Sequence, residues 1–104
     1  MINWGILGTG AIAKAFADAL QDTDGNLIAV ASNSLSRAEE FSSSYGCNPV
    51  EGYNNLISLQ NVDAIYVATP HSSHFYLTSE CLKNHKAVLC EKPMTINATE
   101  TMAL

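Results

Sequence analysis

Apolar positions along the chain follow two alternating patterns. Short, mainly apolar runs of strand length occur at residues 2–7, 27–31, 62–68 and 87–90, and residues 47–53 are the weakest strand candidate. Between them, apolar residues recur with the 3.6-residue period of a helix, which predicts helices at residues 11–21, 36–45, 54–59 and 72–84, with a further one beginning near 97. Strands and helices that alternate at this spacing predict a parallel sheet with right-handed crossovers and helices on both faces.

The first two helices carry the clearest apolar stripes. The stripe of the first consists of Ala13, Phe16, Ala17 and Leu20, and that of the second consists of Ala38, Phe41 and Tyr45. Ser36 and Glu39 have the spacing of a capping box, which predicts that the second helix begins at Ser36. Gly46 is suited to its end, and Pro49 indicates that the third strand candidate is either an edge strand or a loop.

This pattern predicts an α/β fold, a Rossmann-type doubly wound parallel sheet with strand order 3-2-1-4-5. Ligands of such sheets bind at the carboxyl ends of the strands, around the first and fourth. The 104 residues fit one domain, 1–104, with no room for a second core. Because the last predicted helix has barely begun at Leu104, we expect a truncated domain that ends inside a helix.

A glycine motif lies between the first strand and the first helix. It reads Gly8-Thr9-Gly10-Ala11-Ile12-Ala13, or G-x-G-x-x-A. Gly8 would allow the tight turn, Gly10 the close approach of a pyrophosphate, and Ala13 close packing of helix on strand. The free N–H groups of the helix start would face the anion. Glycines also mark purely structural turns, but the strand and helix on either side favour dinucleotide binding at residues 8–12.

The second strand ends without the acidic residue that is usual in NAD-specific folds. Ser32 and Asn33 stand there instead, and Arg37 follows in the next helix. A hydroxyl and a guanidinium suit a ribose 2′-phosphate, so we predict NADP as the favoured cofactor, with NAD as the alternative. In the structural interpretation, Ser32 is a loop or cap residue and Arg37 is a solvated charge.

Two further groups of residues follow the fourth and fifth strands. Thr69, Pro70 and His74 lie where a nicotinamide ribose would be, although His74 suits a structural hydrogen bond equally well. We expect no metal site, because His71 and His74 have no third ligand nearby. Glu91 and Lys92 close the fifth strand, and the lysine would polarise or position a reacting oxygen, unless the two form only a structural ion pair.

Composition narrows the class of protein. Hydrophobic residues make up 47% of the chain and charged residues 14%, which is typical of a globular domain. The net charge is -5 and no basic stripe is present, so nucleic acid is not expected as a partner. The three cysteines form no CxxC pair, and neither a signal peptide nor an 18-residue apolar segment occurs. We therefore expect a cytoplasmic protein that does not enter a membrane.

Together these motifs resemble the glucose–fructose oxidoreductase/inositol dehydrogenase (Gfo/Idh/MocA) family. The matching segments are residues 8–13, 31–38, 68–70 with His74, and 87–93. The resemblance implies an NAD(P)-dependent oxidoreductase that acts on a CH–OH group of a sugar, polyol or diol. It implies that Lys92 is the active-site lysine, that Glu91 lies beside the ribose, and that Thr69, Pro70 and His74 line the nicotinamide side.

Family members continue into a second, substrate-binding domain. We therefore expect the 104-residue chain alone to be inactive, and its exposed apolar surface to allow homo-oligomers. Two other functions fit the glycine loop: a non-catalytic dinucleotide-sensing module, and binding of another nucleotide such as an S-adenosyl compound. Lys92 argues against the sensor, and Arg37 argues against the second nucleotide.

Overall fold

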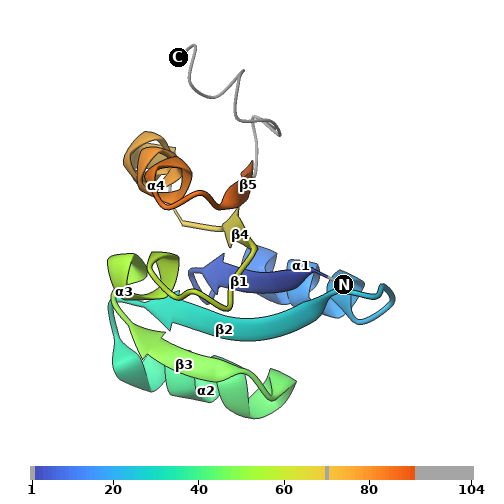
Figure 1. The fold of residues 1–104 in the computed structure, drawn as a ribbon. Helices are drawn as coiled ribbons and strands as arrows, with labels where there is room; N and C mark the ends of the chain where they lie inside the picture. Colours follow the sequence, from blue (N-terminus) through green and yellow to red (C-terminus); the bar gives the residue numbers. More distant parts are fainter. Residues whose placement is uncertain (1, 70, 91–104) are drawn as a thin grey trace.

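The structure, a computed structural model, describes residues 2–69 and 71–90, without the side chains of 71–75 and 90. Its strands are β1 (Asn3–Leu7), β2 (Asn26–Ser32), β3 (Asn48–Glu51), β4 (Ala64–Val67) and β5 (Ala87–Cys90). Its helices are α1 (Ala11–Leu20), α2 (Leu35–Tyr45), α3 (Tyr53–Ile57) and α4 (His71–Lys83). All pairings are parallel, and the strands form one sheet in the order β3-β2-β1-β4-β5, as predicted (Figure 1).

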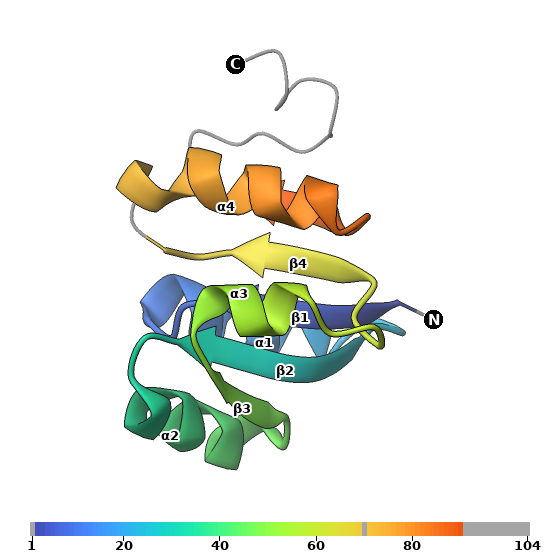
Figure 2. The same ribbon diagram turned by 60° about the vertical axis from the view of Figure 1, so that its left-hand side comes forward.

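Helices cover both faces of the sheet (Figures 1 and 2). On one face, α1 and α2 bury a cluster that consists of Ile6, Ala13, Ala17, Val30, Ala38, Phe41 and Tyr66. On the other face, α3 and α4 bury Leu7, Ala29, Ala31, Leu56, Ile57, Val62, Ile65, Val67, Leu77 and Cys81. Successive residues of the central strands enter opposite clusters, because side chains alternate across a pleated strand. The continuous apolar runs of the sequence are therefore strands buried on both sides.

Three aromatic rings pack α1 against the middle of the sheet. The rings of Phe16 and Tyr66 are stacked, with centroids 4.1 Å apart and planes at 5°. Trp4 meets Phe16 edge to face at 5.0 Å. These contacts fix α1, and with it the loop at its amino end, relative to β1 and β4.

The start of α2 differs from the sequence prediction. Its N-cap is Ser34, with extended backbone angles, so the capping box of Ser36 and Glu39 was wrong. Ser36 lies inside the first turn, and its hydroxyl is 3.0 Å from that of Ser34. The end of the helix was predicted correctly: Gly46 caps it with a left-handed φ of 73°.

A buried lysine binds the segment that connects α3 to β4. Lys86 is only 9% exposed and precedes β5. Its ammonium group donates to the carbonyl oxygen of Val62 at 2.5 Å and to that of Leu59. No sequence pattern predicts this role, because both acceptors are backbone atoms more than twenty residues away.

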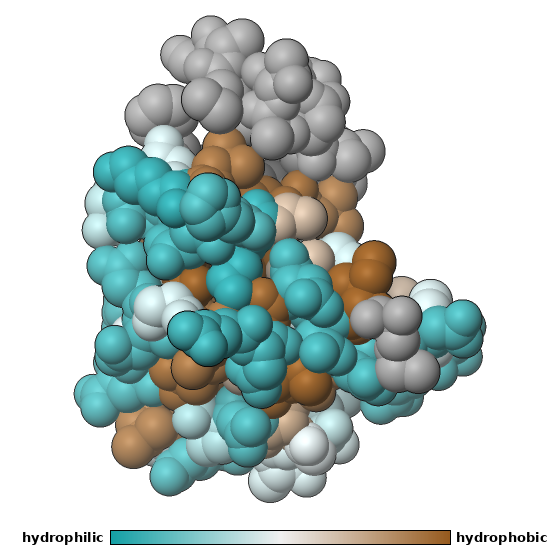
Figure 3. Space-filling view, in the orientation of Figure 1, coloured by the Kyte–Doolittle hydropathy of each residue, from teal (hydrophilic) through white to brown (hydrophobic). Residues whose placement is uncertain are grey.

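The surface of the domain is mixed. Figure 3 shows hydrophilic side chains over most of one face, with hydrophobic ones between them. Among the side chains that the structure describes, the exposed large hydrophobic ones are Ile2, Ile12, Leu35 and Tyr76. In the described part of the chain, no helix has the length and hydropathy needed to cross a bilayer.

Candidate functional site

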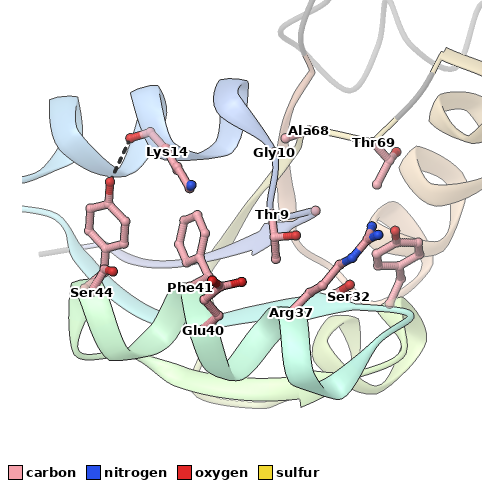
Figure 4. Close-up of a pocket in the computed structure, with 13 residues that line it drawn as sticks. Thr9, Gly10, Lys14, Ser32, Arg37, Glu40, Phe41, Ser44, Ala68 and Thr69 are labelled. Carbon is pink, nitrogen blue, oxygen red and sulfur yellow. Dashed lines mark hydrogen bonds between the residues drawn. The ribbon is translucent and has the colours of Figure 1, made fainter.

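A cavity of about 560 Å³ opens at the carboxyl ends of β1, β2 and β4, between α1 and α2 (Figure 4). The residues that line it are Gly8, Thr9, Gly10, Lys14, Ser32, Arg37, Glu40, Phe41, Ser44, Tyr45, Tyr53, Ala68 and Thr69. It lies at the edge of the sheet where the strand order changes direction, which is where doubly wound folds bind their ligands.

The two glycines of the loop have different structural roles. Gly8 has a φ of +109°, and a Cβ added there would lie 2.8 Å from the carbonyl oxygen of Ala68. Its N–H donates to the carbonyl of Ala31 at 2.8 Å, so this glycine brings the ends of three strands together. A Cβ added at Gly10 would meet nothing within 4 Å. Gly10 therefore leaves space that the protein itself does not fill.

The amino end of α1 faces this space. Gly10 is the N-cap and provides no side-chain acceptor, and no acidic residue lies in the first turn. The first N–H groups of a helix have no partner within it, and the helix dipole adds positive potential there. The loop and helix start thus form a site suited to a phosphate or pyrophosphate. The side chains of Ala11 and Ile12 do not line the cavity, and Ile12 is 48% exposed.

The end of β2 and the start of α2 form a second wall. Ser32 is buried, and its hydroxyl oxygen accepts a hydrogen bond from the Ser34 N–H at 3.1 Å. Arg37 extends from the first turn of α2 toward the strand ends (Figure 4). The structure therefore brings Ser32 and Arg37 to the same cavity as the glycine loop, whereas the exposed Asn33 does not line it.

Residues 2–104 match the sequence model of the Gfo/Idh/MocA family. This family is described as an oxidoreductase family with an NAD-binding Rossmann fold. The chain belongs to this family. It is an NAD(P)-binding Rossmann domain, as the resemblance of its motifs implied.

Two curated relatives are dehydrogenases. Mouse trans-1,2-dihydrobenzene-1,2-diol dehydrogenase is 40% identical over 103 residues, which are 95% of this chain and 31% of the relative. D-xylose 1-dehydrogenase (NADP(+)) from Hypocrea jecorina is 39% identical over 117 residues, which cover 99% of this chain and 30% of that protein. The chain thus spans about a third of the length of these relatives.

A similar solved structure is that of KijD10, a 3-ketoreductase from Actinomadura kijaniata, in complex with TDP-benzene and NADP. The TM-score is 0.88 at 34% identity, and the match covers 98% of this chain and 34% of the other. The likeness extends over almost the whole Gfo/Idh/MocA domain, including every element that lines the cavity.

The nicotinamide side of this Gfo/Idh/MocA domain is described in part. Thr69 is buried at the end of β4 and lines the cavity. His74 lies on α4, but its side chain is outside the described part of the chain, as are Pro70, Glu91 and Lys92. Among the described residues, no group of three or more His, Cys, Asp or Glu side chains is placed to hold a metal ion.

The sequence did not predict several residues of the cavity. Glu40 and Ser44 were overlooked, although they lie three and seven positions after Arg37 and so share a face of α2 with it. Tyr53, at the start of α3, carried no sequence signal. Phe41 and Tyr45 were predicted on the inner face of α2, and they also line the cavity.

Tyr45 connects the two helices beside the cavity. Its hydroxyl donates to Asp18 Oδ1 at 2.9 Å, and it also reaches the carbonyl oxygen of Lys14 at 3.4 Å. The hydrogen bond to Asp18, then burial, then the negative charge of Asp18 raise the pKa of Tyr45 above its ordinary value. This contact links α1 to α2 beside the cavity.

Proposed function

We propose that the cavity binds NADP in preference to NAD, and that the chain is the cofactor-binding part of an oxidoreductase. The observation that carries this proposal is that Arg37 and Ser32 share one cavity with the Gly8–Gly10 loop, while no acid stands at the end of β2. A carboxylate there would bond the ribose 2′-hydroxyl of NAD and repel a 2′-phosphate.

Each group of predicted site residues would contact a different part of the cofactor. The turn at Gly8 would present the amides of Thr9, Gly10, Ala11 and Ile12 to the pyrophosphate, because no side chain caps the start of α1. Ser32 and Arg37 would bind the 2′-phosphate, and Asn33 stays a predicted contact of the same ribose. Thr69, Pro70, His74 and Glu91 would contact the nicotinamide ribose.

The reaction we propose is oxidation or reduction at a CH–OH group of a sugar, polyol or diol. The nicotinamide would supply the hydride chemistry, and the protein would orient the reacting groups. Lys92 stays the predicted catalytic residue, where its charge would polarise the reacting oxygen. The support for this substrate class is that the similar proteins include a diol dehydrogenase and a xylose dehydrogenase.

Cofactor binding by the 104-residue chain tests the proposal most directly. Isothermal titration calorimetry should give tighter binding of NADP than of NAD, and amide shifts should change at Gly8 and Gly10. Arg37→Ala should remove most of the preference, because a charge-assisted contact is worth about 1.5–3 kcal/mol, or roughly one to two decades of affinity. Equal affinities in the unmodified chain, or no shifts at either glycine, would contradict it.

Turnover requires more of the protein than binding does. Productive hydride transfer needs the substrate carbon held about 3–3.5 Å from the nicotinamide. Because the chain spans about a third of its relatives, we expect these 104 residues alone to bind cofactor and to oxidise no sugar, polyol or diol. Formation of reduced cofactor would be followed by absorbance. A cytoplasmic location and self-association also stay predictions.

A further inference from the structure

Lys14 lines the cavity from the opposite side to Arg37. It lies on α1, four residues after Gly10. Figure 4 shows its side chain extending from α1 toward α2, while Arg37 extends from α2 toward the ends of the strands. Two cations on two different helices therefore border the same space.

The charges of the described residues single out these two cations. Lys83 pairs with Glu80 at 3.3 Å, and the ammonium of Lys86 bonds backbone carbonyls. Within residues 2–69 and 71–90, neither Lys14 nor Arg37 forms an ion pair with a carboxylate. In a chain of net charge -5, both of these free cations thus line the cavity.

A tyrosine explains why Lys14 is available. Asp18 lies four residues after Lys14 on α1 and would be its natural helical partner. Asp18 Oδ1 instead accepts the hydrogen bond from Tyr45 at 2.9 Å. The dashed line in Figure 4 marks the bond from the same hydroxyl to the Lys14 carbonyl oxygen, at 3.4 Å. Tyr45 therefore takes one oxygen of the carboxylate that would compete for the Lys14 ammonium, and its hydroxyl also lies near the Lys14 carbonyl oxygen.

Glu40 offsets the charge of Arg37 in the cavity, so a second cation would favour an anionic ligand. Its carboxylate also lines the cavity, so with Arg37 alone the charged side chains would sum to zero. Lys14 makes that sum positive. A phosphate monoester carries a charge of about −1.5 to −2 at pH 7, and its oxygens offer several acceptors for the donors of an ammonium group.

We infer that Lys14 is a second specificity-determining residue for NADP, contacting the 2′-phosphate from α1 while Arg37 contacts it from α2. This inference rests on the proposed binding of NADP in the cavity. Ser32 and the loop then position the ribose between the two cations. NAD lacks the phosphate, so Lys14 contributes little to its affinity.

Lys14→Met tests the inference in the 104-residue chain. Methionine keeps the length and helix propensity of lysine and removes its charge. Calorimetry should show NADP binding weakened roughly tenfold and NAD binding within about twofold of the unmodified chain. Lys14→Arg should restore most of the NADP affinity. The matched control is Lys83→Met on α4, which removes an exposed lysine outside the cavity and should leave both affinities unchanged.

Phosphorus NMR adds a readout that a purely structural role of Lys14 would not change. A nearby ammonium favours the dianion, so the 2′-phosphate pKa of bound NADP should be lower in the unmodified chain than in Lys14→Met. Equal loss of NADP and NAD affinity would place Lys14 at a part shared by both cofactors and overturn the inference. Unchanged affinities in Lys14→Met, with NADP weakened in Arg37→Ala, would overturn it while the proposed function stands. Failure of the unmodified chain to bind either cofactor would refute both.

Discussion

The two glycines of the loop should respond in opposite ways to the same substitution. Gly8→Ala places a Cβ at a φ of +109° and 2.8 Å from the Ala68 carbonyl oxygen. Left-handed backbone costs roughly 1–2 kcal/mol for a residue with a Cβ, and overpacking against a fixed backbone adds about 1–3 kcal/mol. The free energy of unfolding should therefore fall by at least about 2 kcal/mol, which lowers the Tm of a domain this size by roughly 8 °C or more.

Gly10→Ala should leave the fold almost intact. Gly10 has an ordinary φ of -80°, and its added Cβ meets nothing within 4 Å. Replacing glycine by alanine at an N-cap costs about 0.5–1 kcal/mol. The methyl group would, however, occupy the space in which the backbone approaches the pyrophosphate, so the affinity for NADP and NAD should fall together, by roughly tenfold or more.

Thermal unfolding and calorimetry on the two variants separate these effects. Gly8→Ala should lower the Tm by roughly 8 °C or more, whereas Gly10→Ala should lower cofactor affinity with a Tm decrease of only roughly 2–4 °C. Gly46→Ala is a control, because Gly46 also has open space around it but a φ of +73°, so this variant should lose stability without losing affinity at a temperature where it is folded. Cofactor affinity that survives Gly10→Ala would refute the assignment of the loop to the pyrophosphate.

Two further predictions concern contacts outside the loop. Lys86→Met should lower the free energy of unfolding in urea by about 1–3 kcal/mol, because the carbonyl of Val62 loses a buried ammonium donor and that of Leu59 loses one of its two donors; an unchanged midpoint would show that the ammonium contributes no net stability. Tyr45→Phe should destabilise the fold up to about pH 10, and the difference from the unmodified chain should shrink at higher pH. The raised pKa of Tyr45 means that the unfolded tyrosine ionises first, so the stabilisation is complete below pH 10.0 and is lost as the pH rises through the folded pKa. A stability difference independent of pH would contradict this linkage.

Local patterns were sufficient to predict most of the fold. Residues 27–31 are apolar without interruption because β2 is covered on both faces, and Pro49 marks β3 as the edge of the sheet. The start of α2 was not predicted correctly because Ser34 and Ser36 are equally able to cap a helix. The spacing to Glu39 favoured Ser36, but β2 extends to Ser32, and the chain turns into the helix at once.

The sequence predicted those residues of the candidate site that lie in a short segment next to a strand end. The glycine motif, Ser32 and Arg37 each follow directly from a strand end, and the parallel sheet brings strand ends together. Tyr53 reaches the same cavity only because β3 pairs with β2 and turns into α3. That arrangement depends on the tertiary fold, so no spacing in the sequence reveals it. Lys92, the predicted catalytic residue, lies outside the described residues and stays a prediction.

The case of Lys14 shows why charge alone does not identify a binding residue from sequence. Four residues separate Lys14 from Asp18, a spacing that indicates an ordinary ion pair on a solvated helix face. In the structure, the Asp18 carboxylate accepts a hydrogen bond from Tyr45, which lies 27 residues away on another helix. We infer that this long-range hydrogen bond leaves the ammonium available for a ligand. Cofactor preference would then depend on the packing of α1 against α2 as well as on the residues at the end of β2.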